Sequence, residues 1–140
     1  MIKFEQVGQM DIAKINPELT SENDVMNNSF IVDNGVTYLI LNDIHGDDAY
    51  KDAVVIKAGE YLNGYDVSVY NGQKLLIDEK HIAYAEGKSY ADLTVGTMLK
   101  VATTGKLEVT AAAPASGVYF VVTDKITLTE KAVKARVVVC

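Results

Sequence analysis

Residues 95–122 read VGTMLKVATTGKLEVTAAAPASGVYFVV, a run of β-forming residues with almost no side chain suited to catalysis. β-Branched residues lie on both sides of Thr103-Thr104-Gly105. Gly at the end of a short loop between two such runs is typical of a β-hairpin, because Gly adopts positive φ angles without strain. The pattern predicts that Met98–Ala102 pairs with Lys106–Thr110.

Two further pairs of β-type runs are separated by Asn-Gly, the strongest two-residue hairpin signal. They are Phe30–Asp33 and Val36–Leu41 around Asn34-Gly35, and Tyr65–Tyr70 and Gln73–Ile77 around Asn71-Gly72. In the second pair, Tyr65, Val67 and Val69 alternate with polar residues, which predicts a strand with one buried face. Hairpins therefore account for much of the chain.

The runs GVYFVV (117–122) and ARVVV (135–139) are nearly continuous in apolar residues. Such runs suit strands that are buried on both faces or lie at the centre of a small sandwich or barrel. Two short helices are also predicted, in DDAYKDAVV after an Asp47 or Asp48 cap and in KSYADLTVG after a Ser89 cap. We expect an all-β fold, a small β-sandwich or β-barrel built of hairpins.

The chain has 140 residues, which suits a single β-rich domain over residues 27–140. Residues 1–26 differ, because apolar residues are scattered there and no turn closes a hairpin before Pro17. We expect this segment to be an extended N-terminal arm that binds a partner. Its candidate partner-binding residues are apolar residues without an obvious core of their own: Ile2, Phe4, Val7, Met10, Ile12 and Ile15.

Composition argues against several functions. The formal net charge is −6 and Arg136 is the single arginine, whereas nucleic-acid binding relies on clustered Lys and Arg. No apolar run approaches the roughly 20 residues that span a bilayer, and no basic segment precedes an apolar one at the N-terminus. We expect a protein made in the cytoplasm, with no nucleic-acid or membrane partner. Cys140 is the only cysteine, which excludes an internal disulfide.

Two polar segments carry side chains that could support chemistry. NDIHGDDAYKD (42–52) offers oxygen ligands and an imidazole for a divalent cation, from Asp43, His45, Asp47, Asp48 and Asp52. The spacing is not that of a calcium loop, so a solvated turn-rich loop is favoured. His81 follows Asp78 and Glu79 and could act as a general base, although a structural role is favoured. We expect no catalytic, metal or cofactor site.

Three features together resemble a known family. They are AVVIKAGEYLNGYDVSVYNG (53–72), in which a glycine-containing linker joins two strands, LTVGTMLKVATTGKLEV (93–109), and the closing pair GVYFVV and KARVVV. Their order is similar to that of the small head decoration, or cement, proteins encoded beside the major capsid protein in many tailed phages. The resemblance covers about residues 52–139.

The resemblance implies a non-enzymatic virion structural protein that binds the outer surface of a phage head and stabilises it. It also implies the major capsid protein as partner, a location on the capsid surface and a homo-oligomer, either a trimer or a dimer. An arm could add a strand to a neighbour's sheet edge. One alternative is a tail or head-fibre adaptor, or a cell-surface-binding module; another is a small enzyme or metal-dependent protein that uses residues 43–52.

Overall fold

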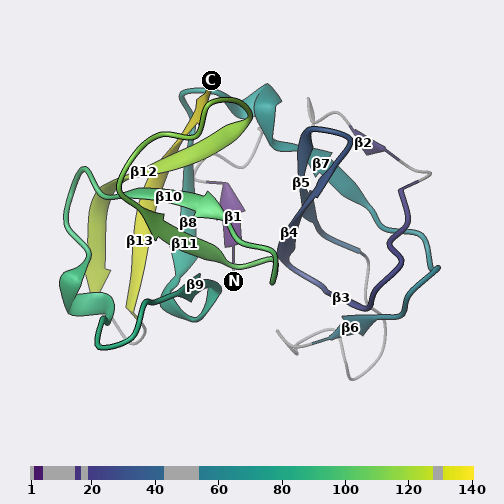
Figure 1. The fold of residues 1–140 in the computed structure, drawn as a ribbon, viewed down its shortest axis with the longest axis horizontal. Coiled ribbons are helices and arrows are strands. Elements are labelled where there is room, and N and C mark those ends of the chain that lie inside the picture. Colours follow the sequence, from purple (N-terminus) through teal and green to yellow (C-terminus); the bar gives the residue numbers. More distant parts are fainter. Residues whose placement is uncertain (1, 5–14, 17–18, 43–53, 128–130) are drawn as a thin grey trace.

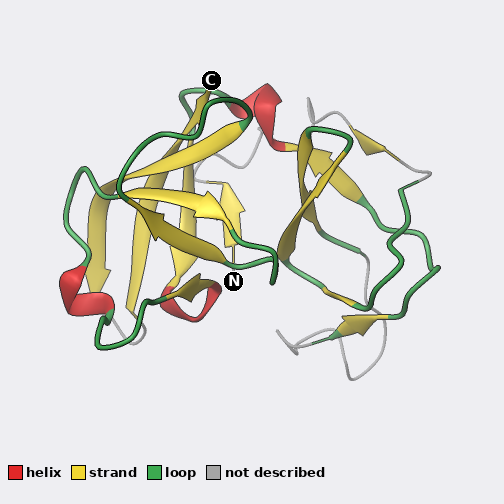
Figure 2. Ribbon diagram, viewed as in Figure 1, coloured by secondary structure: helices red, strands yellow, loops and turns green. Residues whose placement is uncertain are grey.

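The computed structural model describes residues 2–4, 15–16, 19–42, 54–127 and 131–140, and in this part of the chain it shows three β-sheets (Figures 1 and 2). The largest sheet has the order β1-β8-β13-β12-β10-β11-β9. Its strands are β1 (Ile2–Phe4), β8 (Lys74–Asp78), β13 (Lys131–Val139), β12 (Val118–Thr127), β10 (Met98–Val101), β11 (Leu107–Thr110) and β9 (Ile82–Ala83). The predicted all-β fold is confirmed.

The other sheets are smaller. The four-stranded sheet has the order β2-β7-β5-β4, and a ribbon pairs β3 with β6. Their strands are β2 (Ile15–Asn16), β7 (Gly64–Asp66), β5 (Val36–Ile40), β4 (Ser29–Asp33), β3 (Val25–Met26) and β6 (Val55–Ile56). Short 3-10 helices join some strands: η3 (Val67–Tyr70), η4 (Glu79–His81) and η5 (Tyr90–Asp92).

Strands β12 and β13 lie at the middle of the largest sheet, as predicted for two apolar runs. Side chains alternate across a strand, so each strand has one inner face. Phe120 and Val122 of β12 are fully buried on this face, as are Ala135 and Val137 of β13. The residues between them are partly exposed, so these strands are buried on one face rather than two.

Three layers and two apolar cores result. Phe30 and Leu39 of the four-stranded sheet face the largest sheet, where the Phe30 and Phe120 ring centroids are 5.3 Å apart. On the other face, Ile40 packs with Val25 and Ile56 of the β3-β6 ribbon. The four-stranded sheet thus contacts the largest sheet through one face and the ribbon through the other; the largest sheet is at the left of Figure 1 and the ribbon at the lower right.

Two predicted hairpins are confirmed. β4 pairs with β5 through Asn34 (φ 50°) and Gly35 (φ 79°), the positive angles that a two-residue turn requires. β10 pairs with β11 around residues 103–105, where Gly105 has φ 88°. Both depend on local turn chemistry, which the sequence shows directly.

The predicted hairpin at Asn71-Gly72 is wrong. Residues 67–70 form η3 rather than a strand, because the Asp66 carboxylate accepts hydrogen bonds from the Ser68 backbone N–H at 3.0 Å and from its hydroxyl at 2.6 Å. This local turn competes with strand pairing. Val67 and Tyr70 are fully buried, so the expected alternation is absent. Asn71-Gly72 instead carries the chain from the four-stranded sheet to β8 of the largest sheet.

The helix predicted after Ser89 is present as η5, a single short turn. The Asp92 carboxylate accepts a hydrogen bond from the Ser89 backbone N–H at 2.8 Å, which caps the turn. The other predicted helix falls mainly on residues 43–53, outside the described residues.

Candidate binding site

A groove runs between the tip of the β10-β11 hairpin and strand β4. Its largest section has a volume of about 430 Å³ and is walled by Ser29–Val32 on one side and by Val101–Gly105 on the other. A second section of about 240 Å³ shares Val32 and Val101 with the first and continues past Gly117. Val32 and Val101 therefore lie where the two sections meet.

Strand β4 lines this groove with an open edge. In a two-residue hairpin closed by Asp33 and Val36, the backbone groups of Phe30 and Val32 point away from β5. The Phe30 N–H donates to the Gly105 carbonyl at 3.0 Å. The outward backbone groups of Val32 have no hydrogen-bond partner among the described residues, and 58% of Val32 is exposed. The groove thus presents an edge strand able to pair with another strand.

Gly105 seats the hairpin tip against this edge. A Cβ atom at this position would lie 3.1 Å from the Phe30 carbonyl oxygen and 3.3 Å from the Ser29 Cβ. Its positive φ also favours glycine. The tip of the β10-β11 hairpin therefore contacts the protein's own β4.

Asparagines fix the chain at the start of β4. Asn28 is buried, and its side-chain oxygen accepts a hydrogen bond from the Ile2 N–H at 3.3 Å. The Asn27 side-chain amide accepts a hydrogen bond from the Asn42 backbone N–H at 2.8 Å and donates one to the Asn42 carbonyl at 3.2 Å. The side-chain oxygen of Asn42 in turn accepts a hydrogen bond from the backbone N–H of Asn63. These bonds fix the chain just before β4 and just after β5.

The structure corrects part of the predicted arm. Ile2 is 2% exposed within the larger core, and β1 pairs with β8, so this residue does have a core of its own. Phe4 pairs through its backbone with Leu75, and Ile15 with Tyr65. Val7, Met10 and Ile12 lie outside the described residues. Sequence reasoning missed the pairing because β8 is far along the chain from β1.

Of the histidines and carboxylates proposed for chemistry, the structure describes His81 but not those of residues 43–52. Residues 43–52 lie outside the described part of the chain. His81 ends η4, is partly buried and lines a separate hollow with Lys80 and Lys106. Among the described residues, no group of three or more His, Cys, Asp or Glu side chains could hold a metal ion. Within the same ranges, no helix has the length and apolar character needed to cross a membrane.

Tyr84 carries a buried hydroxyl with no hydrogen-bond partner among the described residues. Burial, with smaller contributions from Glu79 and Tyr90, raises the pKa of Tyr84 to about 12. The ring packs against the larger core, next to the sheet rather than in the groove. This hydroxyl therefore affects the stability of the fold and not binding in the groove.

Replacing Tyr84 by Phe is expected to leave the free energy of unfolding at neutral pH unchanged or to raise it by up to about 1 kcal/mol, because no hydrogen bond is lost. Between pH 10 and 12 the unfolded chain releases the Tyr84 proton while the folded chain keeps it, so stability falls as pH rises. Urea unfolding across this range should show a smaller fall in the Tyr84→Phe variant than in the wild type.

Tyr90→Phe is the matched control. The Tyr90 hydroxyl donates to the carbonyls of Ala132 at 2.8 Å and Ile126 at 3.1 Å. Its removal should lower the free energy of unfolding by about 1 to 2 kcal/mol at neutral pH. A loss of this size in Tyr84→Phe would contradict the absence of a partner.

No protein-family model, curated protein or solved structure matches this chain. The site is therefore characterised by its own geometry. An open strand edge beside a groove lined by both polar and apolar residues defines a surface suited to binding an extended segment of another protein.

Proposed function

We propose that the protein is a non-enzymatic virion structural protein of the decoration type, which binds the outer surface of a tailed-phage head and stabilises it. The major capsid protein is the proposed partner and the capsid surface the proposed location. The observation that carries the proposal is the open edge of β4 within the groove. The order of β-type runs over residues 52–139 adds to it through the resemblance to decoration proteins.

The proposed contact is the addition of a strand from the capsid protein to β4. The outward N–H and carbonyl of Val32 supply main-chain hydrogen bonds, each worth about 0.5 to 1.5 kcal/mol net. The exposed Val32 side chain and the partly buried Val101 supply an apolar floor. Binding at one site is then weak, and many copies on one head supply the avidity.

The arm is proposed as a second contact, through Val7, Met10 and Ile12. The backbones of Phe4 and Ile15 pair within the protein, so the predicted partner-binding role of these two residues is proposed for their side chains alone. Ile2 is excluded from this role by its burial. A deletion that tests the arm must therefore spare Ile2–Phe4.

Val32→Pro is expected to reduce binding to heads by about tenfold or more. Proline removes the outward N–H of Val32, which has no partner within the described sheet, so the β4-β5 ladder is kept. Binding is measured by cosedimentation with heads assembled from the capsid protein of the same genome. Circular dichroism checks that the variant is folded.

Val32→Thr is the matched control, because threonine keeps both the N–H and the β-branched shape. It should bind heads within about threefold of the wild type, since it loses only part of one apolar contact. Failure of the wild type to sediment with heads would contradict the proposal. Binding to host cell walls without heads would favour the adaptor or cell-surface module instead.

A further inference from the structure

Charge is segregated along the chain and across the fold. In the part of residues 15–66 that the structure describes there are five Asp and Glu and one Lys, whereas the described part of residues 67–140 has six Asp and Glu and nine Lys and Arg. The first range supplies the four-stranded sheet and the β3-β6 ribbon, and the second supplies most of the largest sheet. The two outer layers of the molecule therefore differ in charge.

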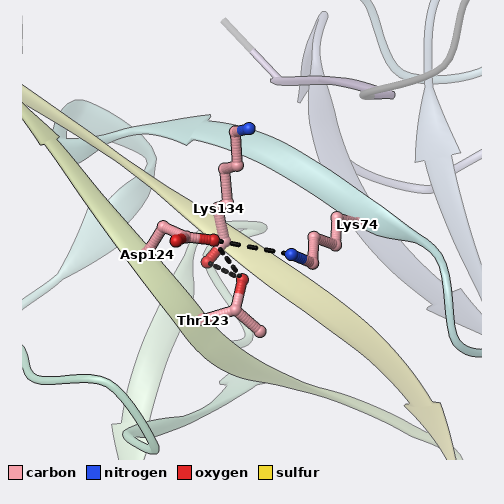
Figure 3. Close-up of polar contacts among 4 residues, drawn as sticks. All are labelled: Lys74, Thr123, Asp124 and Lys134. Carbon is pink, nitrogen blue, oxygen red and sulfur yellow. Dashed lines mark hydrogen bonds and ion pairs between the residues drawn. The ribbon is translucent and has the colours of Figure 1, made fainter.

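The outer face of the largest sheet is basic around its middle. Lys74 pairs directly with Arg136, and Lys134 lies two residues before Arg136 on the same face, opposite Leu76. Asp124 pairs with Lys134 across β12 and β13, and its carboxylate lies 3.6 Å from the Lys74 Nζ (Figure 3). Asp78, which pairs with Ala132, adds a second carboxylate to this face, so three cations are set against two carboxylates and a local excess of positive charge remains.

Apolar side chains continue this face. Val121 pairs with Arg136 and Tyr119 pairs with Val138, and all three apolar residues are partly exposed. We call the set Lys74, Lys134, Arg136, Tyr119, Val121 and Val138 the basic face. It combines an apolar stripe with flanking cations.

The outer face of the β3-β6 ribbon has the opposite character. Val25 and Ile56 point inward and are buried, whereas the next cross-strand pair, Met26 and Val55, points outward and is 43% and 44% exposed. Tyr61, 70% exposed, lies on the neighbouring segment that pairs with Thr20.

Carboxylates surround this apolar group. Glu22, Asp24 and Glu60 are exposed on the segments held together by the bonds Gly59 N–H to Ser21 and Ala58 N–H to Asp24. Lys57, 3.6 Å from Asp24, is the cation among them. We call the set Met26, Val55, Tyr61, Glu22, Asp24 and Glu60 the acidic patch.

We infer that the protein self-associates head to tail, with the basic face of one copy docked on the acidic patch of the next. The two surfaces are opposite in charge, and each has an apolar centre. They lie on opposite outer layers of the molecule, so the basic face of one copy cannot reach the acidic patch of the same copy. A contact of about 800 Å² per partner would use about a tenth of the 8176 Å² accessible surface. Such a heterologous contact closes into a ring or extends into a filament.

The test is sedimentation equilibrium of the purified full chain at low ionic strength, with no phage component present. The wild type should associate, and the double variant Lys134→Glu/Arg136→Glu should raise the dissociation constant by about tenfold or more, because attraction becomes repulsion. Raising the salt to about 1 M should weaken the wild-type association by a similar factor.

Lys88→Glu/Lys106→Glu is the matched control, because it changes net charge equally at exposed positions outside the basic face. It should leave the dissociation constant within about threefold of the wild type. Adding Glu22→Lys/Glu60→Lys to the Lys134→Glu/Arg136→Glu chain should restore association. A monomeric wild type, an equal loss in the control, or no restoration would overturn the inference; none of these results depends on head binding.

Discussion

Phe30→Ala is expected to lower the free energy of unfolding by about 3 to 5 kcal/mol. Phe30 is 1% exposed and contacts Phe120 across the space between the four-stranded and the largest sheet. Its removal leaves a cavity in the core that both sheets share, and neither sheet can close it without moving as a whole. Urea unfolding, followed by circular dichroism, measures the change.

Val32→Ala is the control for this prediction. Val32 lies two residues further on the same face of β4 but is 58% exposed, so its truncation should change stability by no more than about 0.5 kcal/mol. In both variants the free energy of unfolding should fall with urea concentration at the wild-type slope. A loss below about 1 kcal/mol in Phe30→Ala would contradict a shared core.

Ile2→Ala is expected to lower the free energy of unfolding by about 2 to 4 kcal/mol. Ile2 fills the larger core at the edge of the largest sheet, and its N–H donates to the buried Asn28, which fixes the start of β4. Truncation therefore loosens the edge strand and the contact between two sheets together. Thermal or urea unfolding gives the change directly.

Ile2→Val is the matched control and should cost about 0.5 to 1.5 kcal/mol, since one methylene is lost. If Ile2→Ala were as stable as the wild type, Ile2 would behave as a residue of a free arm. That outcome would favour the interpretation drawn from the sequence over the buried position in the structure.

Local signals in the sequence were sufficient for part of the fold. Asn34-Gly35 and Thr103–Gly105 both form their predicted hairpins, because the turn residues themselves specify positive φ angles. Asn71-Gly72 has the same signal but joins two sheets, since burial of Tyr70 and the Asp66 turn override it. Turn chemistry alone cannot say which strands a turn joins.

Non-local pairing explains what the sequence could not predict. β8 pairs with β1 and β13, which come from opposite ends of the sequence, and no periodicity specifies such partners. The groove is missed for the same reason, because Gly105 meets Phe30 through a contact between segments far apart. The sequence does not distinguish the exposed Val32 from the buried Phe30 two residues before it, so it carries no local sign of that groove.

The position of β13 has a consequence for folding kinetics. β13 comes last in chain order but lies between β8 and β12, so the largest sheet is divided until residues 131–139 join it. Pairing across such distances closes large loops, which makes the folding barrier high and the rate slow. A nascent chain that has emerged only as far as β12 holds two unfinished half-sheets with open edges, and is therefore most exposed to aggregation just before β13 emerges.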